Sequence, residues 1–321
     1  MHRLIAAVFV AALLLLPSAI AQAQPWPSRP IQFVIPFGAG SATDTLARIA
    51  GQELAQLLGQ PVVIVPKPGA DGALSGIEVK RARPDGYTFL FGTNSPLAVV
   101  PNMRKEPPYD VLADFTPVTF IGENTFFIVV HPSLPVKTVP ELIAHAKANP
   151  NVLNYAAGNT YALVATGMFA RTAGIEMQAI PYKSEPDAIV DLLAGRVQLM
   201  NSTVTTTAAH IKAGNLKVLA TTFHERSPIM PDVPSILEQG QPRFPIVPWF
   251  ALVGPAGLPR DIVMRMQKEM AAVLANPKVK EQMHQQGFVP RSSTPEELTA
   301  YMKEQLAIWK AALSAAGIEP Q

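Results

Sequence analysis

The feature that most constrains the fold is a regular alternation of short β-branched runs with longer amphipathic stretches. The run from Ile31 to Ile35 is typical of a buried strand, and apolar residues then recur at helical spacing between Leu46 and Leu57. A helix is expected over roughly residues 139–148, and the same alternation then repeats between Leu153 and Thr221, with strands expected at 179–182, 197–200 and 217–221. Such a pattern predicts βα units on a largely parallel sheet, and therefore an α/β fold.

The length of the chain favours two lobes, because 321 residues are about twice the size of a typical domain. The order of the expected strands indicates that the chain crosses between the lobes more than once, near residues 116–122 and 246–250. The expected units are a signal peptide (1–23), the first part of lobe 1 (24–120), lobe 2 (121–247) and a return to lobe 1 with C-terminal helices (248–321).

The N-terminus has the pattern of a secretory signal peptide. A basic start at Arg3 precedes an uninterrupted apolar run from Leu4 to Leu16, which is too short to span a bilayer. Small residues at Ala21 and Ala23 supply the motif that signal peptidase needs, so we predict cleavage after Ala23. An uncleaved anchor is the disfavoured alternative, since no stop-transfer pattern follows. The sequence therefore predicts an exported protein.

Composition and spacing exclude several classes of function. The 26 Lys and Arg residues and the 24 Asp and Glu residues are spread without basic clusters, so the chain lacks the electrostatic footprint of a nucleic-acid-binding protein. No cysteine is present, which rules out thiol nucleophiles and thiolate metal sites. No two histidines have the spacing of a helical metal pair, and no Gly-x-Ser-x-Gly motif occurs. We therefore predict no catalytic residue, metal or cofactor.

The most informative segment is a small-residue loop, Gly38 to Asp44, that joins the first strand to a helix. Glycines there leave the first amides of the helix uncovered, and together with the helix dipole these amides form a ready anion site. Thr43 stands where a dinucleotide fingerprint needs its third glycine, so nucleotide binding is disfavoured. A simple tight turn remains open as an alternative, as does a purely capping role for Asp44.

A comparable junction, Asn154 to Thr160, is expected to open a helix in the second lobe. Two helix N-termini that face each other across a cleft would suit an acid with two or more carboxylates, each held by one lobe. Lys183 and the polar run from Asn201 to Thr203 also follow predicted strands, at the edge where open α/β folds bind ligands. A solvated charge at Lys183 and turn chemistry at Asn201–Thr203 remain equally open.

Many short motifs in one order make the chain resemble a known family. The matching segments are Trp26–Ile31, Pro36–Asp44, Lys67–Gly72, Arg83–Thr88, Pro181–Lys183, Asp191–Gly195, Arg226–Pro228, Pro231–Pro234 and Trp249–Gly257. They extend over essentially all of the chain after the signal peptide. The chain resembles the Bug family, the extracytoplasmic solute receptors of tripartite tricarboxylate transporters.

This resemblance implies a periplasmic binding protein of type II-like fold, with a ligand cleft between two lobes and two crossover strands. It also implies a monomer that captures a small organic acid and delivers it to membrane permease subunits, without enzyme activity or a cofactor. The ligand-binding residues that it implies are Phe37, Gly38, Ala39, Gly40, Ser41, Ala42, Asp44, Thr93, Ala157, Gly158, Asn159, Thr160, Tyr161, Lys183, Asn201 and Ser202.

Several positions depart from the family's usual residues. Ser41 replaces the second glycine of a pair, Ser184 replaces the glycine after Tyr-Lys, and Asn201-Ser202 stands where Phe-Asp is common. These changes leave the receptor class intact and put the ligand's identity in question, above all a ligand with an amine. Two other functions remain open, a ligand-sensing subunit for a membrane signalling protein and a periplasmic hydrolase acting on a carboxylate substrate.

Overall fold

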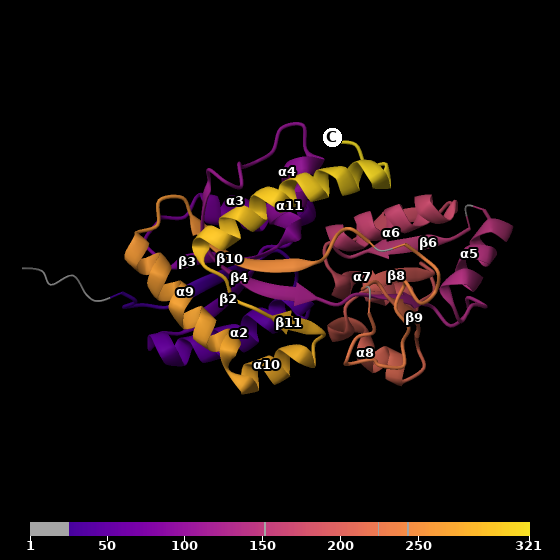
Figure 1. Cartoon of the computed structure of the whole chain (residues 1–321), viewed down its shortest axis with the longest axis horizontal. Helices are drawn as coiled ribbons and strands as arrows, with labels where there is room; N and C mark the ends of the chain where they lie inside the picture. Colours follow the sequence, from indigo (N-terminus) through magenta and orange to yellow (C-terminus); the bar gives the residue numbers. More distant parts are fainter. Residues whose placement is uncertain (1–25, 151, 224, 243) are drawn as a thin grey trace, which may run out of the picture.

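The structure is a computed structural model that describes residues 26–150, 152–223, 225–242 and 244–321. The predicted signal peptide and its cleavage site lie outside these residues. Each of the two lobes is built on one β-sheet, and the lobes lie side by side (Figure 1). The predicted α/β fold with two lobes is confirmed.

The sheet of lobe 1 has the strand order β11-β4-β10-β3-β1-β2. The strand β1 is parallel to β2 and β3, whereas β10 is antiparallel to both β3 and β4. The strands that form this sheet are β1 (Ile31–Ile35), β2 (Val62–Pro66), β3 (Thr88–Thr93), β4 (Phe115–Asn124), β10 (Trp249–Pro255) and β11 (Phe288–Pro290).

The sheet of lobe 2 has the order β7-β6-β8-β5-β9. The strands β7, β6 and β8 are parallel, and β5 is antiparallel to β8 and β9. Its strands are β5 (Phe127–Val130), β6 (Asn154–Ala157), β7 (Gln178–Pro181), β8 (Leu199–Ser202) and β9 (Lys217–Thr221).

Both sheets are mixed, so the expectation of largely parallel sheets is wrong. The difference arises where the chain passes between the lobes, because the chain leaves lobe 1 along β4 and returns along β10, and two neighbouring strands that run in opposite directions pair antiparallel. The strand β4 stays paired with β10 and β11 as far as Asn124, and β5 begins at Phe127 in the other sheet. The first crossing therefore falls later than residues 116–122. The amide of Asn124 donates to the carbonyl of Pro248 at 3.0 Å, which ties the two crossing segments together.

Helices cover both faces of each sheet, because apolar side chains of both sheets are buried under them. In lobe 1, one face is covered by α2 (Ala42–Leu58), α9 (Arg260–Ala275) and α10 (Pro277–His284). On the other face lie η1 (Ala70–Gly72), α3 (Ala73–Lys80), η2 (Ser95–Val99), α4 (Val100–Met103) and α11 (Pro295–Ala316). In lobe 2, α5 (Val139–Ala148) and α6 (Thr160–Ala173) cover one face, and α7 (Glu185–Leu193) and α8 (Val204–Lys212) the other.

The C-terminal helix α11 holds the two lobes together. It begins with a capping box, in which Thr294 and Glu297 satisfy each other's backbone amides. It then runs from lobe 1 toward lobe 2 (Figure 1), where the ring of Trp309 packs edge-on against Tyr161 of α6 at 6.3 Å between centroids. The apolar core on this side is continuous across both lobes.

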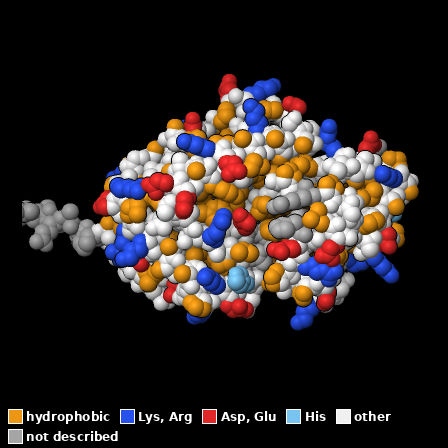
Figure 2. All heavy atoms as spheres, in the orientation of Figure 1, with side chains coloured by type: hydrophobic (Ala, Val, Ile, Leu, Met, Phe, Trp, Pro, Cys, Tyr) orange, Lys and Arg blue, Asp and Glu red, His pale blue; other side chains and the backbone are white. Residues whose placement is uncertain are grey.

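None of the helices in the described part of the chain is long and apolar enough to cross a membrane. On the face in Figure 2, basic and acidic side chains are interspersed, without a large field of one sign. This distribution agrees with the absence of basic clusters in the sequence.

Candidate ligand-binding site

A cavity of about 30 Å³ lies where loops of both lobes meet the crossing segments. The loops follow β1 and β3 in lobe 1 and β6, β7 and β8 in lobe 2, so each leaves the carboxyl end of a parallel strand. The cavity is lined by Phe37, Ser41, Ala42, Thr43, Thr93, Asn94, Ser95, Asn124, Phe126, Gly158, Asn159, Tyr161, Glu185, Thr203, Pro248 and Phe250.

The lobes are in contact around this cavity. The hydroxyls of Ser95 in lobe 1 and Thr160 in lobe 2 share a hydrogen bond. A Cβ atom added to Gly38 would lie 3.2 Å from the hydroxyl of Ser184 in the other lobe. A neighbouring cavity of about 230 Å³ shares Phe37 and Asn159 with the first one. The structure is therefore a closed form, in which the cavity of about 30 Å³ has room for little more than ordered water.

On the lobe 1 side, the loop before α2 is braced by its own side chains. Ser41 is the N-cap residue, and its hydroxyl accepts a hydrogen bond from the amide of Asp44 at 3.3 Å. The carboxylate of Asp44 accepts the amide of Gly40 at 2.9 Å and lies 2.9 Å from the guanidinium of Arg48. Gly40 has a φ of 78°, which other residues adopt only with strain. Asp44 thus fixes the loop from behind the cavity.

The same bracing leaves two helix amides available. Ala42 and Thr43 line the cavity, and within the described residues their amides donate to no protein acceptor. The first amides of a helix have no partner inside the helix, and the dipole of the 17-residue α2 adds positive potential there. This end of the cavity is suited to a carboxylate or another small anion.

Two buried asparagines also present unused hydrogen-bonding groups. Asn94 and Asn124 line the cavity and are 3% and 0% exposed. The amide nitrogen of Asn94 and both polar atoms of the Asn124 side chain have no partner among the described residues. An unpaired buried polar group costs about 1–3 kcal/mol, so these groups favour a bound ligand or water in the cavity.

On the lobe 2 side, the carboxylate of Glu185 is surrounded by hydrogen-bond donors. Its Oε2 accepts from the Ser202 hydroxyl at 3.0 Å, the Thr203 amide at 3.2 Å, and the Thr203 and Thr206 hydroxyls at 2.8 Å each. Its Oε1 accepts from the side-chain amide of Asn159 at 2.9 Å. Glu185 is only 5% exposed, and a Cβ atom on Gly158 would lie 2.8 Å from its backbone. The sequence therefore needs glycine at position 158.

Glu185 is the one carboxylate among the described residues that line the cavity, and no Lys, Arg or His lines it. Burial raises the pKa of Glu185 above its ordinary value, and the hydroxyl and amide donors around it oppose that rise. The lining of the cavity thus combines helix amides without a protein acceptor, from lobe 1, with a buried carboxyl group, from lobe 2.

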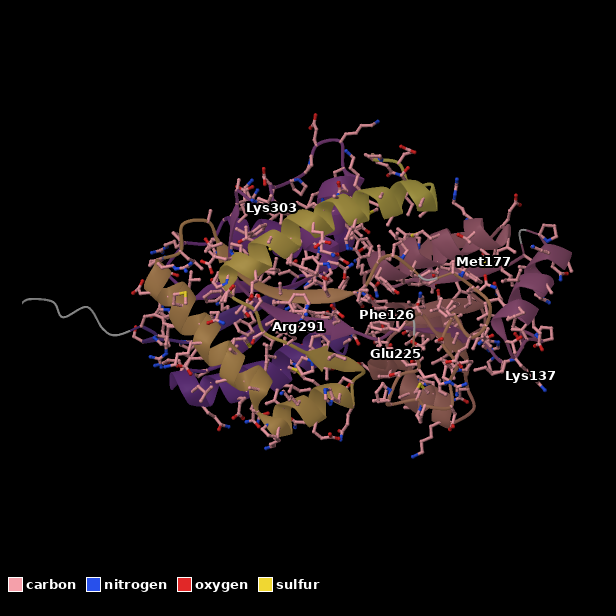
Figure 3. The ribbon with its side chains drawn as sticks, viewed as in Figure 1. Phe126, Lys137, Met177, Glu225, Arg291 and Lys303 are labelled. Atoms are coloured by element: carbon pink, nitrogen blue, oxygen red, sulfur yellow. The ribbon has the colours of Figure 1, made fainter. Side chains whose placement is uncertain are left out.

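Aromatic rings close the cavity toward the core. Phe126 lies at the junction of the lobes (Figure 3), with its ring centroid 4.6 Å from that of Tyr161. The Tyr161 hydroxyl shares a hydrogen bond with Thr222 at 2.9 Å, and burial raises its pKa. Trp249 instead packs against Phe120 and Tyr301 and does not line the cavity.

The structure brings together about half of the residues that the sequence analysis names. Those that line the cavity are Phe37, Ser41, Ala42, Thr93, Gly158, Asn159 and Tyr161. Gly38, Ala39, Gly40, Asp44 and Thr160 lie in the same loops without lining it. Ala157 and Lys183 line the neighbouring cavity, and Asn201 lines a separate one of about 10 Å³.

One local expectation is wrong. Asn201 and Ser202 do not follow the strand but are its last two residues, because β8 begins and ends later than the predicted run from Val197 to Met200. Both side chains are buried. Ser202 reaches the cavity only through its hydrogen bond to Glu185.

Sequence reasoning missed nine of the lining residues. These are Thr43, Asn94, Ser95, Asn124, Phe126, Glu185, Thr203, Pro248 and Phe250. Thr43 and Thr203 lie within named segments, Gly38–Asp44 and Asn201–Thr203, but are absent from the implied ligand-binding residues, and Asn94 follows the named Thr93 at a strand end. For Glu185 the available signal was its place three residues after the expected strand, at the start of a helix. Asn124 had no such signal, because its position depends on where β4 ends.

Comparisons with known proteins agree with this geometry. Residues 46–318 match the model of the tripartite tricarboxylate transporter family receptor. The chain is 34% identical to protein BugT of Bordetella pertussis over 295 residues, which are 91% of this chain and 90% of BugT.

Two solved structures share the fold along nearly the whole chain. An R. palustris protein with adipate has a TM-score of 0.89 and 31% identity, over 92% of this chain and 100% of that one. The periplasmic binding protein BugD has a TM-score of 0.87 and 32% identity, over 92% and 100%. The chain therefore belongs to the tripartite tricarboxylate transporter receptor family, which is the Bug family that its sequence motifs resemble, and it is a solute-binding receptor rather than an enzyme.

Proposed function

We propose that the protein is a periplasmic receptor that captures a small organic acid between its lobes and delivers it to the membrane permease of a tripartite tricarboxylate-type transporter. The observation that carries this proposal is that Ala42 and Thr43 line a closed cavity between the lobes and that their amides have no protein acceptor among the described residues. Their preference for an anion fits a carboxylate, and the related R. palustris protein was solved with adipate.

Binding is coupled to closure of the lobes. A cavity of about 30 Å³ is too small for an organic acid to enter unless the lobes move apart, so the acid binds an open form. Once the lobes close around the acid, water is excluded and the acid pairs with the unused groups of Asn94 and Asn124. The ligand then shifts the population toward the closed form, and the permease distinguishes the two forms.

We assign ligand contact to the residues that the family resemblance implies. In lobe 1 they are the loop from Phe37 to Ala42, with Asp44 as its brace, and Thr93. In lobe 2 they are the loop from Ala157 to Tyr161, while Lys183, Asn201 and Ser202 border the site. Export with cleavage after Ala23, and a monomeric receptor, belong to the same proposal.

The direct test is a melting-temperature screen of the exported protein, unfolded and refolded to remove captured ligand. The panel contains mono-, di- and tricarboxylates, aromatic acids, amino acids and uncharged sugars. A ligand at 100 times its dissociation constant adds about 2.7 kcal/mol of stability, and the melting temperature should rise by several degrees. A response only to uncharged solutes would overturn the proposal. Uptake of the same acid that requires both receptor and permease tests delivery.

A further inference from the structure

The two lobes contribute groups of opposite requirement to the cavity. Lobe 1 contributes donors that have no protein acceptor, the amides of Ala42 and Thr43 and the side-chain nitrogen of Asn94. Lobe 2 contributes a carboxylate, that of Glu185. No basic side chain lines the cavity within the described residues, so nothing there neutralises Glu185 by an ion pair.

The two oxygens of Glu185 differ in how fully they are used. Oε2 accepts four hydrogen bonds, whereas Oε1 accepts one, from Asn159. Each carboxylate oxygen has about two lone-pair directions, so Oε1, which accepts one hydrogen bond, retains room for a further donor. All of its present donors are neutral. An ammonium or hydroxyl group at Oε1 would complete the shell, and an ammonium would also balance the charge.

We infer that the ligand is a monocarboxylate that presents its carboxylate to the start of α2 and an N–H or O–H donor to Glu185. This inference rests on the proposed function and narrows its organic acid to one class. A dicarboxylate would place a second ionised group beside Glu185 in a small cavity without a cation, where like charges repel strongly. An acid with a terminal ammonium satisfies both the amides at the start of α2 and the carboxylate of Glu185, so ammonium is the favoured donor.

The test compares acids of equal length that differ only at the far end. The pairs are adipate with ε-aminocaproate and ε-hydroxycaproate, and succinate with γ-aminobutyrate and γ-hydroxybutyrate. Calorimetric titration gives each dissociation constant at neutral pH. The wild-type protein should bind a donor-ended acid about ten- to a hundredfold more tightly than the matching dicarboxylate.

Variants at Glu185 should change this preference in opposite ways. Glu185→Gln keeps the shape and removes the charge, so the preference for the ammonium should fall about tenfold or more. Glu185→Ala uncovers the donors of Asn159, Ser202 and Thr203, which together form an anion site. That variant should therefore prefer the dicarboxylate.

Asp187→Asn is the matched control. Asp187 is an exposed carboxylate on the same helix, accepts a hydrogen bond from Ser184 at 2.7 Å and does not line the cavity. Its substitution should leave the order of affinities unchanged. If Glu185→Ala fails to fold, Glu185→Gln still decides the outcome, because it preserves the volume of the side chain.

Two results would count against these proposals. Equal affinity for the dicarboxylate and the donor-ended acid, in the wild type and in Glu185→Gln, would contradict the inference and would mean that Glu185 only stabilises the starts of α7 and α8. Failure of the wild type to bind any acid would overturn the proposed function itself.

Discussion

The two sides of the cavity share one topology and differ in polarity. Each is formed by loops at the carboxyl ends of parallel strands, and each includes the start of helices. On the lobe 1 side, Asp44 turns away from the cavity to brace Gly40, and the helix amides stay uncovered. On the lobe 2 side, Glu185 points among the helix starts and accepts the donors of α6 and α8 itself.

This difference shows that topology sets the place of a site but not its charge preference. Two carboxylates, Asp44 and Glu185, lie in the first turn of their helices, where the dipole favours both. Asp44 braces its loop without lining the cavity, whereas Glu185 lines the cavity. A displacement of a single side chain therefore decides whether a helix start offers donors or an acceptor to a ligand.

The largest effect is expected from Ala42→Pro, which removes one amide of the lobe 1 side. Proline is favoured at the first position of a helix, and Ser41 before it already has the extended φ of −70° and ψ of 161° that proline requires. The fold should tolerate the change, while binding of every carboxylate weakens about ten- to a hundredfold. Calorimetric titration measures the loss.

Ala42→Gly is the control for this variant, since it keeps the amide and removes only a methyl group. It should bind nearly as well as the wild type, although glycine costs the helix up to about 1 kcal/mol. Unchanged binding by Ala42→Pro, with a melting temperature close to that of the wild type, would show that the α2 amides do not hold the ligand.

The sequence allowed the loop before α2 in lobe 1 to be predicted because its determinants are local. A buried strand, Ile31–Ile35, a glycine loop and a cap at Ser41 follow one another within a few residues, and the structure has β1 and α2 in those places. The same holds for Val139–Ala148 and Lys217–Thr221, whose predicted bounds agree with α5 and β9.

The lobe 2 side could not be predicted in the same way because it is assembled from distant segments. Glu185 finds its donors at Asn159, 26 positions earlier, and at Thr203, 18 positions later. Only the pairing of β6 with β7 and β8 brings them together. Asn124 depends in turn on how far β4 stays paired, which the hydrophobic pattern does not encode.

A smaller effect, on stability, should distinguish the two carboxylates further. The folded-state pKa of Glu185 is raised by burial, so the native protein holds a proton that the unfolded chain has released. Stability from this group is therefore greatest below the unfolded pKa of about 4.3 and falls as pH rises toward the folded value. Glu185→Gln should gain stability relative to the wild type across that range.

Denaturant unfolding of both proteins at a series of pH values gives the difference between their free energies of unfolding. Taking the difference removes the opposite trend of Asp114 and Asp191, whose pKa values are lowered by hydrogen bonds to Lys80 and Tyr182 respectively. A difference that does not change with pH would mean that Glu185 has the same pKa in both states, and its burial would then be fully offset by its donors.

The smallest effect is expected at Lys183. With Asp71 it lines the neighbouring cavity of about 230 Å³ and not the cavity between the lobes. Its side chain is exposed, so its charge acts through solvent and is screened by salt. Lys183→Gln should slow association of an acid by roughly a fewfold at low salt, raise the dissociation constant by no more than that factor, and lose both effects at high salt. Stopped-flow binding at two salt concentrations measures this. A loss of about tenfold at both concentrations would instead place Lys183 against the ligand in the closed form, and lobe 2 would then supply a cation as well as a carboxylate. In that case Glu185 would no longer lack a counter-ion, and the preference for an ammonium would have to weaken with it.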